Sequence, residues 1–291
     1  MASKEKVNRA DIKTSMLECI NGSLILLSQK PLPDGNAIHD IRVMMKKQRA
    51  AVRLVKPLLD EPVYNREYLA GRETGRILSS WRESNVLRKT MKALRKDHPE
   101  LFTKLWDNET VQNLLRKPYA TWEQAGVQAK TVSKVTEQLT RAGYRIRFLS
   151  LNELDFRMLL GEVEQSYLAA ARAYLDCRNN TKPRLLHEFR KKSKTLMYQL
   201  DFFRHLNPAA VKSLEKRLDI MTRNLGKYND LDQILTILGY KYRDSANSDV
   251  NDELAVVIKD RQDSYLMKVW PAAYRIFMPG KKLQDLLDIS F

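Results

Sequence analysis

The chain has 291 residues, 43% of them hydrophobic, which suffices for one large or two medium globular domains and argues against a disordered tail. Its formal net charge is +16. A charge of this size exceeds what solubility requires. It indicates a polyanionic partner, such as nucleic acid, an anionic membrane or another phosphate polymer.

The two cysteines, Cys19 and Cys177, form no CxxC pair or Cys/His cluster, so the sequence predicts neither a disulfide framework nor a zinc site. No apolar run reaches membrane-spanning length, and the N-terminal residues lack the apolar region of a signal peptide. We therefore expect a cytoplasmic protein with no membrane partner and no cofactor.

A low glycine content and helical spacing of apolar residues predict an all-α fold. The predicted helices cover residues 4–29, 36–60, 63–96, 100–116 and 120–142 in the first half, and 151–177, 184–206, 207–239 and 253–277 in the second. Gly226 is a possible interruption of the 207–239 segment. Residues 244–252 are expected to form a loop, residues 283–291 a short amphipathic tail, and Tyr144–Arg147 a connection between the halves.

One motif occurs twice, about half a chain apart. Each copy has a histidine, an arginine three residues later and a lysine seven residues later: His39, Arg42 and Lys46, then His187, Arg190 and Lys194. The copies are offset by 148 residues (39 to 187), and a second pair of segments, beginning at Arg76 and Arg223, keeps an offset of 147. Two separated motifs with nearly one offset indicate an internal duplication.

Both motif segments are amphipathic as helices. In the first copy, the histidine and the cations Arg42, Lys46, Arg49 and Arg53 fall within about 80° of one another, opposite an apolar face that includes Ile41, Met45 and Val52. In the second copy, the polar face holds His187, Arg190, Lys191, Lys194 and Tyr198, opposite Phe189, Leu196, Leu200 and Phe203. Arg42 and Lys46 are expected to face a ligand and not to support the core.

A basic helix face is often only a solvated surface, but such surfaces usually mix both charge signs. Like charges one turn apart repel each other, so the same arrangement in two copies favours a site for an anion. The sequence thus predicts two four-helix bundles related by a pseudo-twofold axis, with residues 1–146 and 147–291 forming the halves of a single domain.

The duplicated His-x-x-Arg-x-x-x-Lys helices resemble the CHAD family (conserved histidine α-helical domain). Trp81–Val86 resembles that family's Arg-Asp-x-Asp-Val turn, with Glu83 and Asn85 replacing the two acids, and Leu225–Asp232 resembles its Leu-Gly-x-x-Asn-Asp-x-Asp segment. The resemblance implies two pseudo-symmetric four-helix bundles that bind inorganic polyphosphate in a basic cavity or groove, without catalysis. We expect this cavity to lie between the two bundles, with the two basic helices facing each other across the pseudo-twofold axis. Thr195 and Met197 depart from the basic residues common in the family, which predicts a weaker second site.

These patterns together give a set of expected polyphosphate-binding residues. They are His39, Arg42, Lys46, Lys47, Arg49, Arg53, Arg76 and Arg82 in the first half, and His187, Arg190, Lys191, Lys194, Tyr198 and Arg223 in the second. The two histidines have an alternative role as structural residues in the first turns of their helices. Arg76 and Arg223 have an equally plausible role as ordinary surface residues.

No nucleotide-binding, hydrolase or metalloprotease motif occurs, and Glu162-Val-Glu164 lacks the lysine of a triphosphate-tunnel module, so we expect a non-enzyme. Sequence-independent nucleic-acid binding is the main alternative. It is less favoured because single-strand binding predicts aromatic residues among the cations, and only Tyr198 is aromatic on either basic face. An adaptor that carries proteins to polyphosphate granules is compatible with the first reading.

Overall fold

The computed structural model describes residues 9–30, 32–116, 125–151, 155–239 and 250–289. These residues form twelve α-helices and no strand, which confirms the predicted all-α class. No described helix is both long enough and apolar enough to cross a bilayer.

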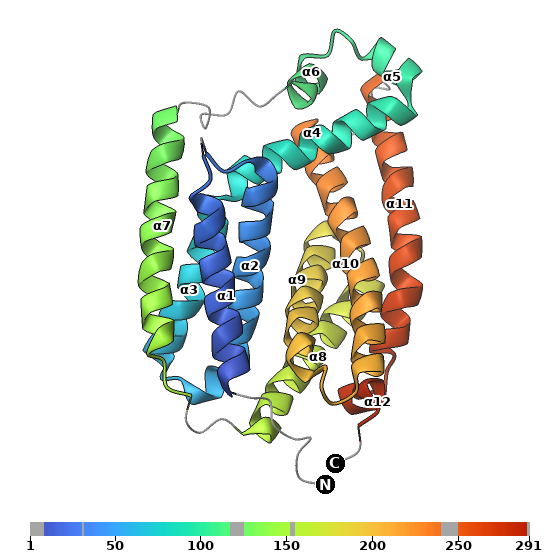
Figure 1. The fold of residues 1–291 in the computed structure, drawn as a ribbon. Coiled ribbons are helices and arrows are strands. Elements are labelled where there is room, and N and C mark those ends of the chain that lie inside the picture. The colour runs from blue at the N-terminus through green and yellow to red at the C-terminus, as the bar shows by residue number, and fades with distance from the viewer. Residues whose placement is uncertain (1–8, 31, 117–124, 152–154, 240–249, 290–291) are drawn as a thin grey trace.

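The helices gather in two groups, seen side by side in Figure 1. The first group contains α1 (Arg9–Leu27), α2 (Gly35–Leu54), α3 (Glu61–Ile77) and α7 (Ala125–Arg147). In this group α1 and α3 each pack against both α2 and α7. The second group contains α8 (Phe156–Asn179), α9 (Pro183–Leu200), α10 (Pro208–Ile237), α11 (Val250–Phe277) and the short α12 (Leu283–Leu287).

In the second group α9 and α11 each pack against both α8 and α10. The two groups meet where α2 packs against α9. A third element, α4 (Ser79–Asp97), crosses over one end of the molecule and packs against both α2 and α10 (Figure 1). Beyond it lie α5 (Pro99–Lys104) and α6 (Glu109–Leu115). The two groups are therefore joined by the direct contact between α2 and α9 and, at one end of the molecule, by α4.

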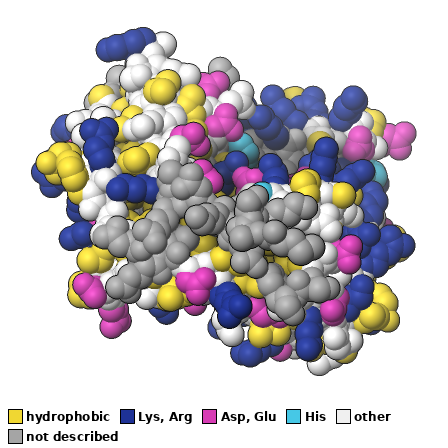
Figure 2. Space-filling model, turned by 60° about the horizontal axis from the view of Figure 1, so that its bottom comes forward, with side chains coloured by type: hydrophobic (Ala, Val, Ile, Leu, Met, Phe, Trp, Pro, Cys, Tyr) yellow, Lys and Arg dark blue, Asp and Glu magenta, His cyan; other side chains and the backbone are white. Residues whose placement is uncertain are grey.

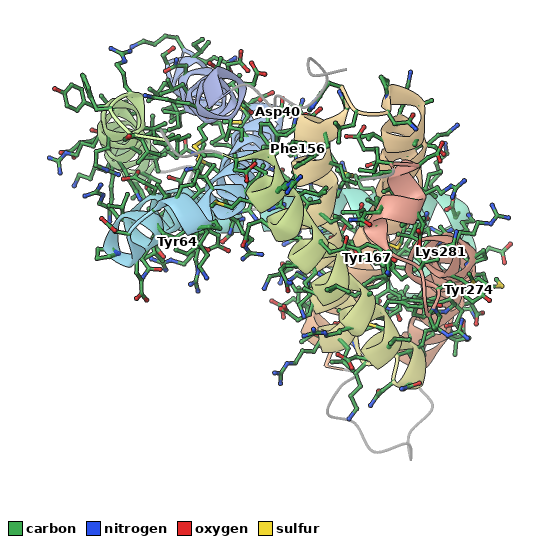
Figure 3. The ribbon with its side chains drawn as sticks, turned by 90° about the horizontal axis from the view of Figure 1, so that it is seen from below. Asp40, Tyr64, Phe156, Tyr167, Tyr274 and Lys281 are labelled. Carbon is green, nitrogen blue, oxygen red and sulfur yellow. The ribbon has the colours of Figure 1, made fainter. Side chains whose placement is uncertain are left out.

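The core follows the predicted apolar faces. Its largest buried side chains include Tyr167, Phe189 and Phe203. Tyr167 of α8 also holds the C-terminal segment, because its hydroxyl lies 3.0 Å from the carbonyl oxygens of both Ile276 and Lys281. Figure 3 shows Tyr167 directed toward the segment that carries Lys281. A smaller apolar cluster lies where α4, α5 and α6 meet α10 and α11.

Several predicted boundaries are wrong, and tertiary packing explains them. The predicted 63–96 helix breaks at Leu78, a fully buried residue after which α4 turns to cross the molecule. The predicted 100–116 helix is two helices, because the side chain of Asn108 accepts a hydrogen bond from the backbone of Val111 at 3.0 Å and starts α6. Gly226 does not interrupt α10.

Two expected loops are also helical. Tyr144–Arg147 forms the last turn of α7 and is not a connection between the halves. In the predicted 244–252 loop, residues 250–252 belong to α11, whereas residues 244–249 lie outside the described part of the chain. Both errors are at helix ends, where local sequence is least informative.

Candidate anion-binding site

The first basic helix, α2, is oriented by its cap and its apolar face. The carboxylate of Asp34 accepts hydrogen bonds from the backbone of Asn36 at 3.0 Å and of Ala37 at 2.7 Å, so the helix begins at Gly35. The predicted apolar residues Ile41, Met45 and Val52 are buried. Their burial turns the opposite, cationic face of α2 toward α9.

The second basic helix, α9, is oriented in the same way. Pro183 occupies its first turn, and Phe189, Leu196 and Leu200 are fully buried as predicted. A buried hydrogen bond joins the two helices, because the side-chain amide of Gln199 donates to the carbonyl of Ala50 at 3.2 Å. The two predicted cationic faces therefore meet along one seam.

A pocket of about 230 Å³ opens at this seam. The cations that line it are Lys46, Arg49 and Arg53 from α2 and Arg190, Lys191, Lys192 and Lys194 from α9. Glu188 is the only acid among the lining residues, and Tyr68 and Tyr198 are the aromatic ones. Seven cations from two helices thus surround one space of ligand size.

A second pocket of about 290 Å³ continues the first and shares Arg53, Lys192 and Thr195 with it. It adds Lys56 and Tyr64, together with Glu162 of α8. We call the two pockets together the basic groove. In the view from below, α3 with Tyr64 lies to the left of α8, across the junction between the two groups (Figure 3).

Tyrosines accompany the cations of α2, and they come from α3, which lies outside the two predicted basic faces. The hydroxyl of Tyr68 accepts a hydrogen bond from Nη2 of Arg53 at 3.1 Å. The guanidinium carbons of Arg49 and Arg53 lie 5.8 Å and 5.5 Å from the centre of the Tyr68 ring. Tyr64 stacks on Tyr68 with ring centres 5.6 Å apart, and Nζ of Lys56 lies 5.5 Å from the Tyr64 ring.

Burial affects the charges of the groove. It lowers the pKa of Arg49, an effect that Tyr68 opposes and that the nearby cations Arg53 and Arg72 strengthen. Burial likewise lowers the pKa of Lys194, although Asp219 opposes it. Cations that are partly removed from water and placed near one another favour the arrival of an anion, which relieves both costs.

Acids accompany the cations of α9. Nζ of Lys194 lies 3.3 Å from a carboxylate oxygen of Asp219, which also pairs with Arg223 of α10. Nζ of Lys191 lies 2.9 Å from the carboxylate of Glu188. By contrast, no acidic side chain described by the structure forms an ion pair with Arg49 or Arg53. Of the residues predicted in the second half, Lys194 and Tyr198 line the groove, whereas Arg223 lies outside it.

The two motif arginines have a role that was not predicted. Arg42 donates from Nη1 to the carbonyl of Gly75 in α3, and Arg190 donates from Nε to the carbonyl of Thr222 in α10 at 3.0 Å. Each arginine thus links its basic helix to the next long helix. Arg42 was expected only to face a ligand and not to support the core, but it also joins α2 to α3. Arg42 also lies outside the groove, while Arg190 lines it.

The two histidines lie away from the groove. His39 lines a separate pocket of about 430 Å³ with Asn85, Arg88 and Lys89. His187 is half-buried, and burial is the main cause that lowers its pKa. The positive charges of Arg190 and Lys191 lower the pKa further, whereas Glu188 and a hydrogen bond with Asn229 raise it. The structure therefore does not bring the two histidines together with the central cations.

Two further predicted residues, Lys47 and Arg76, also lie elsewhere, and a third is not described. Lys47 is exposed near α1, where burial raises the pKa of the Cys19 thiol to about 11 and Lys47 opposes that rise. Arg76 is exposed and pairs with Glu73 on its own helix at 2.8 Å. The side chain of Arg82 lies outside the described residues.

Sequence reasoning missed Lys56, Tyr64, Tyr68 and Lys192. A signal existed for the tyrosines, because residues four apart share one face of a helix. Lys192 directly follows a predicted site residue, but its helical phase places it next to the apolar face and outside the basic one. The basic character extends beyond the groove: in Figure 2, Lys and Arg side chains gather at the upper right, on the side of the molecule that carries α8 to α12.

No cluster of three or more potential metal ligands occurs among the described residues. No curated protein matches the chain in sequence. The family model for the CHAD domain matches residues 28–238, which include α2, α9 and every residue that lines the basic groove. The chain therefore belongs to the CHAD domain family.

Proposed function

We propose that this protein binds inorganic polyphosphate in the basic groove without chemically altering it. One observation carries the proposal: seven Lys and Arg side chains from α2 and α9 line one pocket, with a single acid among them. Cations at this density repel one another unless an anion lies between them. A polymer with one negative charge on each repeating unit matches a row of cations better than a compact anion does.

The family supports the proposal, because the CHAD domain is associated with polyphosphate binding. The residue types also suit the ligand. Arg49, Arg53 and Arg190 offer planar pairs of N–H donors for non-bridging oxygens, whereas Lys46, Lys191 and Lys194 act as mobile point charges. The ligand has no bases, so the groove needs no group that reads them.

We also propose that the two groups of helices are duplicated four-helix bundles about a pseudo-twofold axis. The four long helices of each group pack in the same cyclic pattern. The hydrogen bond from Arg190 to Thr222 repeats the one from Arg42 to Gly75. The two donors are 148 residues apart in the sequence and the two acceptors 147. On this proposal residues 1–146 and 147–291 are the halves of one domain, and the groove lies between them.

Single-stranded nucleic acid is the second candidate, favoured by the three tyrosines in the groove. Base stacking requires an accessible ring face. Tyr64 and Tyr68 stack on each other, and cations lie over both rings, so these faces already have partners. This geometry favours contacts with a chain of phosphates over stacking of nucleic-acid bases.

In a cell, binding of polyphosphate would associate the protein with cytoplasmic polyphosphate granules, where it could act as an adaptor for other proteins.

A competition assay tests the choice. Labelled long-chain polyphosphate is bound at fixed salt and challenged with unlabelled polyphosphate, single-stranded RNA, DNA and orthophosphate at equal phosphate concentration. We expect polyphosphate to compete at least about tenfold better than either nucleic acid, and orthophosphate hardly at all, because it engages few cations at once. Equal competition by RNA would favour the second candidate, and equal competition by orthophosphate would indicate a small-anion pocket. Release of phosphate during the assay would contradict the non-catalytic proposal.

A further inference from the structure

Tyr68 has an unusual position among the residues of the groove. It lies on α3, yet it contacts two arginines on successive turns of α2. Its hydroxyl accepts from Arg53, and its ring lies beneath both Arg49 and Arg53. One neutral side chain from another helix therefore orients two guanidinium groups at once.

Such orientation matters because arginine side chains are long. A guanidinium that moves freely loses conformational entropy when it binds a ligand, and two cations one turn apart also repel each other. On α9, Asp219 holds Lys194 in place, but its negative charge weakens the attraction for an anion. A tyrosine holds an arginine through its ring and hydroxyl without neutralising the charge.

The arrangement extends along α3. Tyr64, one turn before Tyr68, stacks on its ring and lies beneath Lys56, which follows α2 in a short 3-10 turn (Lys56–Leu58). Two stacked rings thus support three successive cations along one wall of the groove. Glu67 does not belong to this wall, because it is buried and paired with Arg145 at 2.6 Å.

We propose that Tyr68 is a positioning residue for polyanion binding, which holds Arg49 and Arg53 ready to bind while leaving their charges intact. This inference rests on the proposed function for its consequence. Its structural half, the ordering of the two arginines, is a property of the protein without ligand. The two halves can therefore be tested separately.

The first test is a mutant cycle on polyphosphate affinity. Tyr68→Phe removes the hydroxyl and keeps the ring, and we expect it to weaken binding about threefold. Tyr68→Leu removes the ring as well, and we expect a loss of about tenfold. Because the hydroxyl interacts with both Arg49 and Arg53, Tyr68→Phe should have almost no further effect in a background that carries both Arg49→Ala and Arg53→Ala. The control is Tyr274→Phe on the outer face of α11, which should bind like the wild type.

Two readouts separate positioning from a merely structural role. No charge is lost in either Tyr68 variant, so the slope of log affinity against log salt should stay that of the wild type, whereas Arg53→Ala should lower it. In the protein without ligand, NMR relaxation of the guanidinium Nε–H groups should show Arg49 and Arg53 more mobile in Tyr68→Leu than in the wild type.

The possible results are distinct. Equal losses for Tyr68→Phe in the wild type and in the background with both arginines replaced would overturn the inference, because the hydroxyl would then act independently of Arg49 and Arg53. Unchanged mobility of both arginines in Tyr68→Leu would overturn it whatever the ligand is. If the wild type failed to bind polyphosphate but Arg49 and Arg53 were still more mobile in Tyr68→Leu, only the proposed function would be contradicted.

Discussion

The basic faces of α2 and α9 have similar sequences but different surroundings. On α2, a neutral tyrosine supports Arg49 and Arg53. On α9, the acids Asp219 and Glu188 pair with Lys194 and Lys191. At the offset of 148 residues, the positions of Arg49 and Arg53 are occupied by Met197 of α9 and by Asp201, which directly follows α9.

This difference indicates how a duplicated motif can become unequal. A cation that already has a carboxylate partner must share or exchange it when a phosphate arrives, whereas a cation held by an aromatic ring can add the phosphate at little cost. We therefore expect α2 to contribute more binding free energy than α9, although α9 supplies more of the cations. The sequence departures at Thr195 and Met197 point the same way.

The largest expected effect compares two double variants. Arg49→Ala with Arg53→Ala should weaken polyphosphate binding by at least about 30-fold, because each lost charged hydrogen bond is worth about tenfold or more. Lys191→Ala with Lys194→Ala should cost about three- to tenfold, since both lysines already pair with a carboxylate that a phosphate would have to replace. Affinity measured at one salt concentration checks both variants.

Folding controls accompany this comparison. Circular dichroism should show unchanged helix content in both double variants. Met45→Asp should unfold the protein, because Met45 is 1% exposed and an unpaired charge would be buried there. Equal losses of affinity in the two double variants would mean that the surroundings of the cations do not matter, and the comparison between α2 and α9 would fail.

A smaller effect is expected at His187, beside the α9 cations. Burial first, and then Arg190 and Lys191, lower its pKa below the ordinary value. A bound polyanion favours the charged imidazole and should raise this pKa, so a proton is taken up on binding. Affinity should then strengthen as the pH falls from about 8 to about 6, by less than about threefold because His187 lies outside the groove. His187→Gln should abolish this part of the pH dependence, and an NMR titration that showed the same pKa with and without ligand would exclude it.

Local periodicity was sufficient to predict the helical class and the two opposed faces of α2 and α9. Met45 and Phe189 are buried where their helical phase required it. The break at Leu78 was not predictable, because it depends on where α4 must cross to reach α10. The expectation that the two basic helices face each other rested on the duplication and the family resemblance, because no local pattern shows a contact between residues about 150 positions apart.

The site was predicted in part for a related reason. A helical projection groups residues of one helix, so it placed Arg42 with Arg49 and Arg53. Arg42, however, donates a hydrogen bond to the carbonyl of Gly75 on another helix, and its side chain does not line the groove. Tyr68 was missed for the converse reason, because it lies on a helix whose own pattern carries no basic stripe. Contacts between helices decide which cations remain for a ligand.

The salt dependence of long-chain polyphosphate binding tests the central claim most directly. Neutralisation of several phosphates by the groove releases counterions, so log affinity should fall linearly with log salt, with a slope of magnitude about 3 or more between about 50 and 200 mM. Arg49→Ala with Arg53→Ala should reduce that magnitude by about 1 to 2, while Tyr274→Phe leaves it unchanged. An affinity that barely changed over this range, or a slope unaffected by loss of the two arginines, would contradict binding in the basic groove.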